Sequence, residues 1–159
     1  MALLSSEEFK FVVKTTPLIS VDLIVENSTG EILLGWRNNL PAKGYWFVPG
    51  GRIQKNEAFT DAFRRITSAE TGMELGLSDA AFLGIYEHLY PHENFSGDPS
   101  FGTHYIVIAY RIKLDQPIDH LPKEQHADYW WASIDEILEN PNVHINTQNY
   151  FNGHPSLTG

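Results

Sequence analysis

The glycines at positions 50, 51 and 72 restrict the possible folds of this chain more than any other feature. Gly50 and Gly51 interrupt an apolar segment, and Gly72 directly follows a run with helical periodicity over residues 58–71. The apolar stripe of that run consists of Phe59, Ala62, Phe63 and Ile66. Because glycine readily adopts the left-handed conformation in which helices end, we expect the helix to end at Gly72. We therefore predict a tight glycine loop that leads directly into a packed helix.

The first half of the chain predicts a short helix followed by paired strands. Ser5 and Glu8 have the spacing of a capping box, which favours a helix that Pro17 stops. Residues 18–26 alternate between two faces, and after a short turn the chain returns as a second strand over residues 31–37. We expect these two strands to form a hairpin.

The second half of the chain predicts further strands separated by long loops. The expected strands span residues 80–88, 103–114 and 129–132. A second capping box at Ser133 and Glu136 predicts a helix that ends near Pro141. The loops 90–102 and 115–128 are long enough to favour a functional role. This order of elements favours a mixed α/β (α+β) sandwich over a doubly wound sheet, because hairpins dominate the first half.

Length and composition favour one domain spanning residues 1–159. A chain of 159 residues with 42% apolar content can form one hydrophobic core, and it is too short for two domains of typical size. The tail from about residue 152 to 159 is rich in Gly, Pro and Ser, so we expect it to be flexible.

Charge and cysteine content narrow the class of partner. The formal net charge of -9 disfavours nucleic acid, whereas a small anionic substrate can bind through a bridging cation. The chain has no cysteine, which excludes disulfides and thiolate metal sites. No stretch approaches the roughly 18 apolar residues of a membrane span, and residues 1–10 lack the basic and apolar regions of a signal peptide. We therefore expect a cytoplasmic protein that binds neither nucleic acid nor a membrane.

The segment from the glycine loop to Gly72 also has the residues of a cation site. Its helix bears a carboxylate at Glu70, and Mg²⁺ needs few protein carboxylates when backbone oxygens and substrate phosphates complete its shell. The segment resembles the Nudix box, G-x5-E-x7-R-E-U-x-E-E-x-G-U, where U is a bulky aliphatic residue. The matching positions are Gly51, Glu57, Arg65, Glu70, Gly72 and Met73. This resemblance implies an α/β/α sandwich around a mixed β-sheet, and a hydrolase that requires a divalent cation.

Three positions depart from the Nudix box. Ile66 and Ala69 replace glutamates, and Thr67 replaces an aliphatic residue, so Glu70 is the only helix carboxylate left of the usual trio. The remaining pattern, R-x-x-x-A-E-x-G, resembles the GDP-mannose mannosyl hydrolase branch. The stretches TPLIS-D, VENS-GE, LLG-R, GYWFVPGGR, NFSG, THY and EQH-DY elsewhere in the chain resemble it as well. The similarity extends to about residue 132. It implies a homodimer that hydrolyses GDP-mannose, or a related GDP-sugar, to GDP and free sugar by attack of water at the sugar carbon.

The resemblance assigns the cation and the base. One Mg²⁺ per subunit, or Mn²⁺ in its place, would be held by Glu70, the Gly50 carbonyl, Gln125 and substrate phosphates. His126 would be the general base that takes a proton from the attacking water. Behind these groups Arg65 would support Glu70, and Glu57 would tie the loop to Arg65.

The resemblance also assigns the substrate contacts. Arg37 and Arg52 would neutralise the departing GDP, and Asp22 would stabilise positive charge at the sugar carbon. His88 and Tyr105 would hydrogen-bond the diphosphate or the leaving group. Phe9 and Tyr90 could stack on guanine, although packing in the core or in a dimer interface explains them equally well.

Three questions stay open from the sequence. A conventional Nudix pyrophosphohydrolase would instead release GMP and a sugar phosphate, although the replacements at Ile66 and Ala69 argue against it. A non-catalytic module that binds nucleotide sugars would also have a degenerate box. The sugar itself is not fixed, because Trp36 stands where related sequences often have a basic residue and two residues are added near Pro91 and His92. GDP-fucose and GDP-glucose are alternatives to GDP-mannose.

Overall fold

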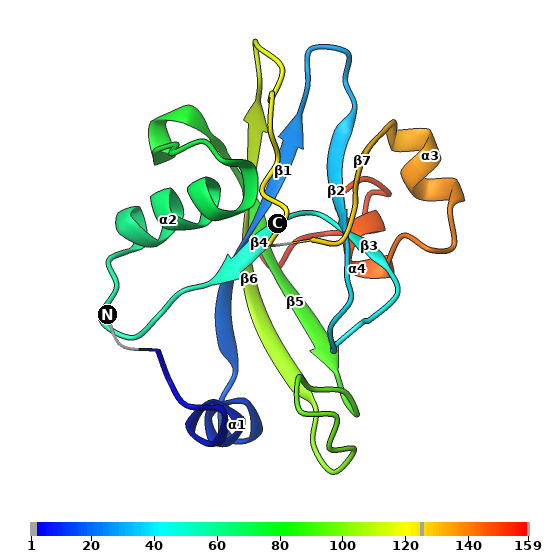
Figure 1. Ribbon diagram of the computed structural model, residues 1–159. Helices are drawn as coiled ribbons and strands as arrows, with labels where there is room; N and C mark the ends of the chain where they lie inside the picture. The colour runs from blue at the N-terminus through cyan, green and yellow to red at the C-terminus, as the bar shows by residue number, and fades with distance from the viewer. Residues whose placement is uncertain (1–2, 125, 159) are drawn as a thin grey trace.

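A mixed β-sheet with helices on both faces forms the protein (Figure 1). The computed structural model describes residues 3–124 and 126–158. The strands are β1 Leu18–Glu26, β2 Ile32–Trp36, β3 Trp46–Phe47, β4 Gly50–Arg52, β5 Ala81–Tyr90, β6 Thr103–Lys113 and β7 Tyr129–Ala132. The α-helices are α1 Ser6–Thr15, α2 Phe59–Thr71, α3 Ile134–Glu139 and α4 Ile145–Gln148, and a 3₁₀ turn, η1, spans Leu77–Asp79.

The strand order places β1 at the centre of the sheet. The main path runs β3-β2-β1-β6-β5, with β7 paired to β2 and β4 paired to β1. β1 is parallel to β6, and the other pairs are antiparallel, so the sheet is mixed as predicted. One edge of β1 is shared between two partners: Glu26 pairs with Ile32 of β2, whereas Asp22 pairs with Gly50 of β4. This sharing brings the glycine pair beside Asp22.

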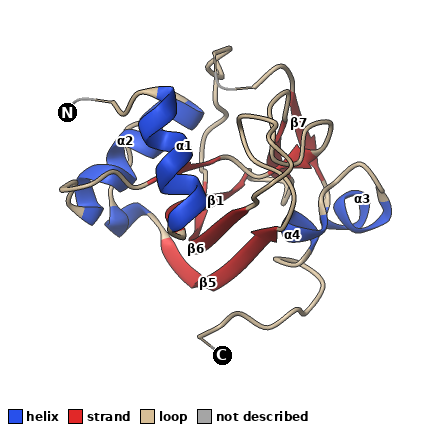
Figure 2. Ribbon diagram, turned by 90° about the horizontal axis from the view of Figure 1, so that it is seen from below, coloured by secondary structure: helices blue, strands red, loops and turns tan. Residues whose placement is uncertain are grey.

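Two cores lie on opposite faces of the sheet, which confirms the predicted α/β/α sandwich. On one face Val21, Leu23 and Val25 of β1 pack with α2, as the predicted alternation requires. On the other face Ile24 packs with residues of and beside α3 and α4. Figure 1 shows α2 on one side of the sheet and α3 with α4 on the other, and Figure 2 shows α1 across the end of the sheet near β6. None of the helices among the described residues is long and apolar enough to cross a membrane.

The local signals for the helix ends are confirmed. Ser5 and Ser133 each accept a hydrogen bond from the backbone N–H three residues on, and both capping boxes are complete. Gly72 has the left-handed backbone conformation, with φ 77°, and ends α2 where predicted. The strand predicted over residues 80–88 extends to Tyr90.

Several elements differ from the prediction, and the short elements β3 and η1 were not predicted. Residues 50–52, which we expect to form a tight loop, form strand β4 against β1. Position 50 requires glycine because β4 approaches β1 closely there. A Cβ atom at this position would lie 2.5 Å from Asp22 Oδ1 and 2.6 Å from the Val21 carbonyl oxygen. The helix α4 was not predicted. It follows the end of α3 and leads into Tyr150.

The tail follows β5 in the structure. The Leu157 amide donates to the Ile85 carbonyl at 2.7 Å, and the Thr158 hydroxyl accepts from the Ile85 amide at 3.3 Å. The flexibility of this segment stays a prediction.

Candidate active site

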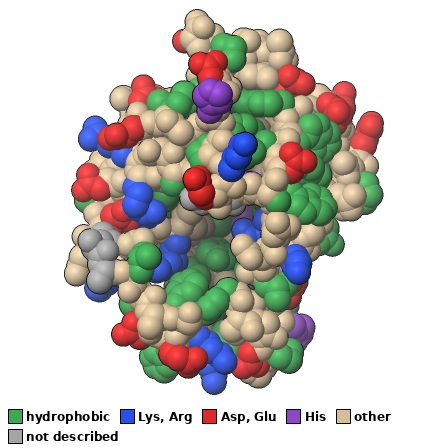
Figure 3. Space-filling model, viewed as in Figure 1, with side chains coloured by type: hydrophobic (Ala, Val, Ile, Leu, Met, Phe, Trp, Pro, Cys, Tyr) green, Lys and Arg blue, Asp and Glu red, His purple; other side chains and the backbone are tan. Residues whose placement is uncertain are grey.

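A pocket of about 280 Å³ lies between the glycine strand β4, the end of α2 and one end of the sheet. In Figure 3 it is the hollow near the centre of the face, with basic side chains at its edge. The predicted residues that line it are Asp22, Arg37, Gly50, Arg52, Glu70, His88, Tyr90, Tyr105 and His126. These positions are far apart in the sequence, so the fold gathers most of the predicted site. Phe9, Glu57 and Arg65 lie outside the lining, and Gln125 lies outside the described residues.

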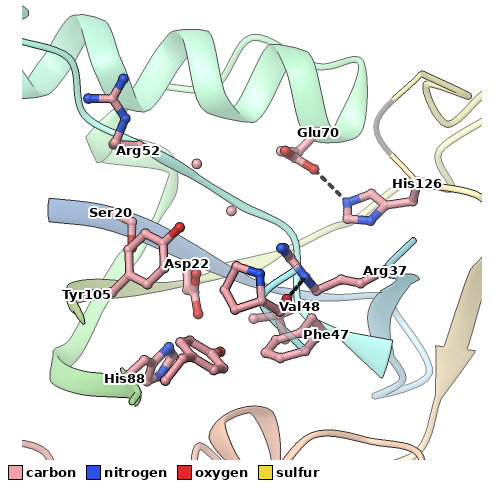
Figure 4. A pocket seen from close by; sticks show the side chains of 14 residues that line it. Ser20, Asp22, Arg37, Phe47, Val48, Arg52, Glu70, His88, Tyr105 and His126 are labelled. Carbon is pink, nitrogen blue, oxygen red and sulfur yellow. Dashed lines mark hydrogen bonds and ion pairs between the residues drawn. The ribbon is translucent and has the colours of Figure 1, made fainter. Parts of the chain in front are cut away.

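Glu70 and His126 lie next to each other at one end of the pocket, with their side chains pointing toward one another (Figure 4). Glu70 lies in the last turn of α2 and is only 7% exposed, and its Oε2 is 2.8 Å from His126 Nε2. The imidazole packs edge-to-face on Tyr129 and lies directly over Gly35 of β2. A Cβ atom at Gly35 would be 2.4 Å from the ring carbon Cγ of His126. Gly35 therefore provides the space that holds this imidazole against Glu70.

The donors at this end of the pocket fit a single divalent cation. Among the described residues, no group of three His, Asp or Glu side chains could hold a metal ion by itself. Glu70 offers one carboxylate, and Gly50 and Gly51 of β4 line the same pocket. One carboxylate with a backbone oxygen is the sparse protein shell that Mg²⁺ accepts when substrate phosphates complete it. Ile66 is 1% exposed and packs in the core behind Gly51. A cluster of several cations on the usual helix carboxylates therefore does not fit.

Asp22 lies on the sheet side of the pocket and has an unusual environment. The Tyr150 hydroxyl donates to Asp22 Oδ2 at 2.5 Å. Burial raises the pKa of Asp22 to about 7, and the Tyr150 hydrogen bond and the Arg37 charge oppose that rise. The carboxyl can therefore hold or release a proton near neutral pH. Sequence reasoning missed Tyr150, because no local pattern connects a tyrosine near the C-terminus to the first strand.

Arg37 and Arg52 bring positive charge to the pocket, and each is held by an aromatic ring. Arg37 Nε donates to the Pro41 carbonyl at 3.0 Å, and its guanidinium lies 5.5 Å from the centre of the Phe47 ring. The Arg52 guanidinium lies 4.8 Å from the centre of the Phe9 ring. Phe9 therefore contacts the site through Arg52.

Arg65 and Glu57 tie the segment before α2 to the helix. Arg65 donates to the two Glu57 carboxylate oxygens at 2.6 and 2.8 Å, and to the Arg52 carbonyl at 2.8 Å. This bidentate pairing lowers the pKa of Glu57. The described contacts of Arg65 thus support the Arg52 backbone. The resemblance instead places Arg65 behind Glu70.

His88, Tyr105 and Tyr90 form the inner wall of the pocket. His88 and Tyr105 are paired residues of β5 and β6. His88 is 6% exposed, and burial, with a smaller effect of His144, lowers its pKa to about 4, so the imidazole is neutral at pH 7. The Tyr90 hydroxyl accepts from the Asn146 side chain at 3.0 Å, and its ring packs with Phe47, so Tyr90 belongs to a small core as well as to the pocket.

Comparison with known proteins gives one family and one fold. Residues 16–151 match the family model described as NUDIX domain. Low-salt glycan biosynthesis protein Agl8 of Haloferax volcanii is 39% identical over 122 residues, which cover 76% of this chain and 74% of the relative.

Two solved structures share the architecture. A MutT NUDIX hydrolase from Burkholderia pseudomallei superimposes with a TM-score of 0.67 at 23% identity, covering 86% of this chain and 96% of that one. The MutT protein of Methanosarcina mazei Go1 gives a TM-score of 0.65 at 22% identity, covering 86% and 92%. At these identities the two structures bear on the fold alone.

Proposed function

The chain belongs to the Nudix hydrolase family, and on that premise we propose that it hydrolyses a GDP-sugar, foremost GDP-mannose, to GDP and free sugar. The proposal includes one Mg²⁺ or Mn²⁺ per subunit and a homodimer, both implied by the resemblance to GDP-mannose mannosyl hydrolases. The Haloferax relative, whose name refers to glycan biosynthesis, supports a sugar-nucleotide substrate.

The pairing of Glu70 with His126 is the observation that carries this proposal. Ordinary Nudix chemistry uses several helix carboxylates to activate water for attack on phosphorus, and here Ile66 is buried in the core while Ala69 has no donor atom. Here a single buried carboxylate, Glu70, has its Oε2 2.8 Å from Nε2 of His126. This arrangement suits a mechanism in which the two residues have separate roles. Glu70 would hold the cation, and His126 would act on the water.

The proposed step balances as a displacement at carbon. The water oxygen forms a bond to the anomeric carbon as its proton passes to His126, and the bond from that carbon to the diphosphate oxygen breaks with its electron pair leaving on GDP. Arg37 and Arg52 would stabilise the negative charge that grows on the diphosphate. A divalent cation held by Glu70 and the Gly50 carbonyl would add to that stabilisation.

Asp22 would act at the other end of the breaking bond. Positive charge develops on the sugar as the leaving group departs, so an ionised carboxylate facing the ring favours the transition state. His88 is neutral at pH 7, so its imidazole N–H can donate a hydrogen bond to a diphosphate oxygen without adding positive charge. Tyr105, its partner on β6, lines the same wall.

Product analysis tests the proposal. The protein is incubated with GDP-mannose and Mg²⁺, and the nucleotides and sugars are separated by ion-exchange chromatography. We expect GDP and mannose in equal amounts, and loss of turnover in H126Q. GMP with mannose 1-phosphate would identify a conventional pyrophosphohydrolase. Tight binding without turnover across GDP-mannose, GDP-fucose and GDP-glucose would identify a binding module.

A further inference from the structure

Tyr150 is a partly buried residue whose hydroxyl reaches the wall of the pocket. It follows α4, and its hydroxyl donates to Asp22 Oδ2 at 2.5 Å. Within residues 3–124 and 126–158, no other group hydrogen-bonds the Asp22 side chain. The two residues are 128 positions apart in the sequence. The bond therefore connects the C-terminal segment directly to the central strand of the sheet.

The Tyr150 ring is held rigidly. It packs edge-to-face on Tyr86, with ring centres 4.7 Å apart and an interplanar angle of 84°. The backbone before it is fixed as well, because the Tyr150 amide donates to the Thr147 carbonyl at 3.1 Å and the Thr147 hydroxyl accepts from the Val48 amide at 3.3 Å. A hydroxyl on such a ring has little freedom to follow a moving partner.

The second oxygen of Asp22 is constrained from another direction. Oδ1 lies close above Gly50, since a Cβ atom on that glycine would be 2.5 Å away. One carboxylate oxygen is thus held by Tyr150, and the other faces the β4 backbone in the pocket wall. Rotation of the Asp22 side chain would break the first contact.

We propose that Tyr150 is a positioning residue that fixes the Asp22 carboxylate for its contact with the sugar. This inference rests on the proposed function in one respect, namely that Asp22 faces the sugar ring. Stabilisation of a developing charge depends on where the opposite charge is placed before the reaction, so a displaced Asp22 would lose much of its effect. A purely structural role for Tyr150 would instead affect folding and leave turnover of the folded protein unchanged.

The test is a double-mutant cycle in the full chain. Y150F, D22N and the double variant are assayed with GDP-mannose and Mg²⁺, and Y86F is the matched control, because the Tyr86 hydroxyl makes no hydrogen bond within the described part of the chain. We expect Y150F to lower kcat by about 10- to 100-fold while KM stays within about threefold. We also expect Y150F to add little to the loss caused by D22N, and Y86F to keep the wild-type kcat.

Two outcomes would overturn the inference. Y150F could retain a kcat within about twofold of the wild type, or its effect could simply multiply with that of D22N, as independent sites do. The unfolding midpoint of each variant, measured by urea denaturation, ensures that only folded protein is compared.

A readout independent of activity separates this inference from the proposed function. Crystal structures of the wild type and Y150F are determined under the same conditions, and we expect the Asp22 side chain to turn away or to become disordered in Y150F. An unchanged Asp22 orientation would contradict the inference whatever the substrate is. An inactive wild type with a displaced Asp22 in Y150F would instead contradict the proposed function and uphold the positioning role.

Discussion

At the scale of single residues, two carboxylates of the pocket each have one hydrogen-bonding side chain among the described residues. Asp22 is hydrogen-bonded by Tyr150, and Glu70 pairs with His126. Removing one member of such a pair leaves the other without its partner, which is costly to the extent that the remaining group is shielded from solvent. Single substitutions here should therefore affect the reaction much more than equivalent substitutions at the surface.

Replacing Glu70 tests the cation site. E70Q keeps the shape of the side chain but replaces a carboxylate with a neutral amide, a weaker ligand for Mg²⁺. We expect kcat to fall by about 100- to 1000-fold and the Mg²⁺ concentration for half-maximal activity to rise. E74Q is the matched control, since Glu74 is exposed shortly after the end of α2. Wild-type kinetics and Mg²⁺ dependence in E70Q would contradict the assignment.

His88 should make stability depend on pH. Its folded pKa, lowered by burial to about 4, lies below the value of about 6.5 for an unfolded histidine. The unfolded state therefore binds the proton first, so the contribution of His88 is complete above about pH 6.5 and is lost as the pH falls towards 4. The full loss is about 3.5 kcal/mol, taking 1.4 kcal/mol for each pKa unit.

Comparison of variants isolates this effect. Asp22 has a raised folded pKa, so its contribution grows as the pH falls over the same range and opposes that of His88. Urea unfolding of the wild type and H88Q from pH 7.5 to 4.5 should show the wild type losing stability relative to H88Q. H92Q, at an exposed loop position, should follow the wild type. Parallel pH profiles for the wild type and H88Q would show that His88 is not buried in its neutral form.

At the scale of elements, the sequence predicts what nearby residues determine. The capping boxes at Ser5 and Ser133 and the glycine at position 72 define helix ends through contacts within one turn, and these predictions are confirmed. β4 is different, because residues 50–52 become a strand only by pairing with β1. The short helix α4 likewise depends on packing against β3, on a distant part of the chain.

The site depends on long-range contacts even more strongly. Glu70 lies on a helix and His126 in a loop, 56 positions apart, and no spacing rule connects them. The family resemblance predicted Glu70 as a cation ligand and His126 as the general base. The fold brings the two side chains within hydrogen-bonding distance. Tyr150 belongs to the segment beyond the main resemblance, so neither pattern nor family pointed to it. Gly35 belongs to the stretch LLG-R of the resemblance, but nothing in the sequence indicated that the His126 ring lies on it.

Replacing Gly35 tests the packing of β2 against the loop that carries His126. In G35A the new methyl group would lie 2.4 Å from the His126 ring, so the ring must move. We expect kcat to fall by about 100-fold, because the base leaves its position, while the unfolding midpoint changes little. G76A is the matched control, since a methyl group there meets its nearest neighbour at 3.8 Å. Wild-type activity in G35A would show that the position of this ring is not critical.

At the scale of the whole molecule, one sheet links the two cores. Side chains of β1 alternate between the core under α2 and the core under α3 and α4, and β6 also contributes to both. Neither core can therefore open without disturbing the strands that support the other. The pocket is lined by residues of the sheet and of α2, so it depends on the packing of these layers.

This arrangement predicts one cooperative unfolding transition for the chain of residues 1–159. Calorimetry should give a single peak whose calorimetric enthalpy equals the van't Hoff enthalpy. Fluorescence and circular dichroism should report the same midpoint. Two resolved peaks, or different midpoints from the two probes, would mean that the layers unfold separately.

The position of bond cleavage tests the central proposal most directly. Hydrolysis of GDP-mannose with Mg²⁺ is run in ¹⁸O-labelled water, and the products are analysed by mass spectrometry before the free sugar exchanges its anomeric oxygen. We predict ¹⁸O in mannose and unlabelled GDP, as attack at carbon requires. Label in GDP, GMP or mannose 1-phosphate would place the attack at phosphorus and contradict the roles proposed for His126 and Asp22.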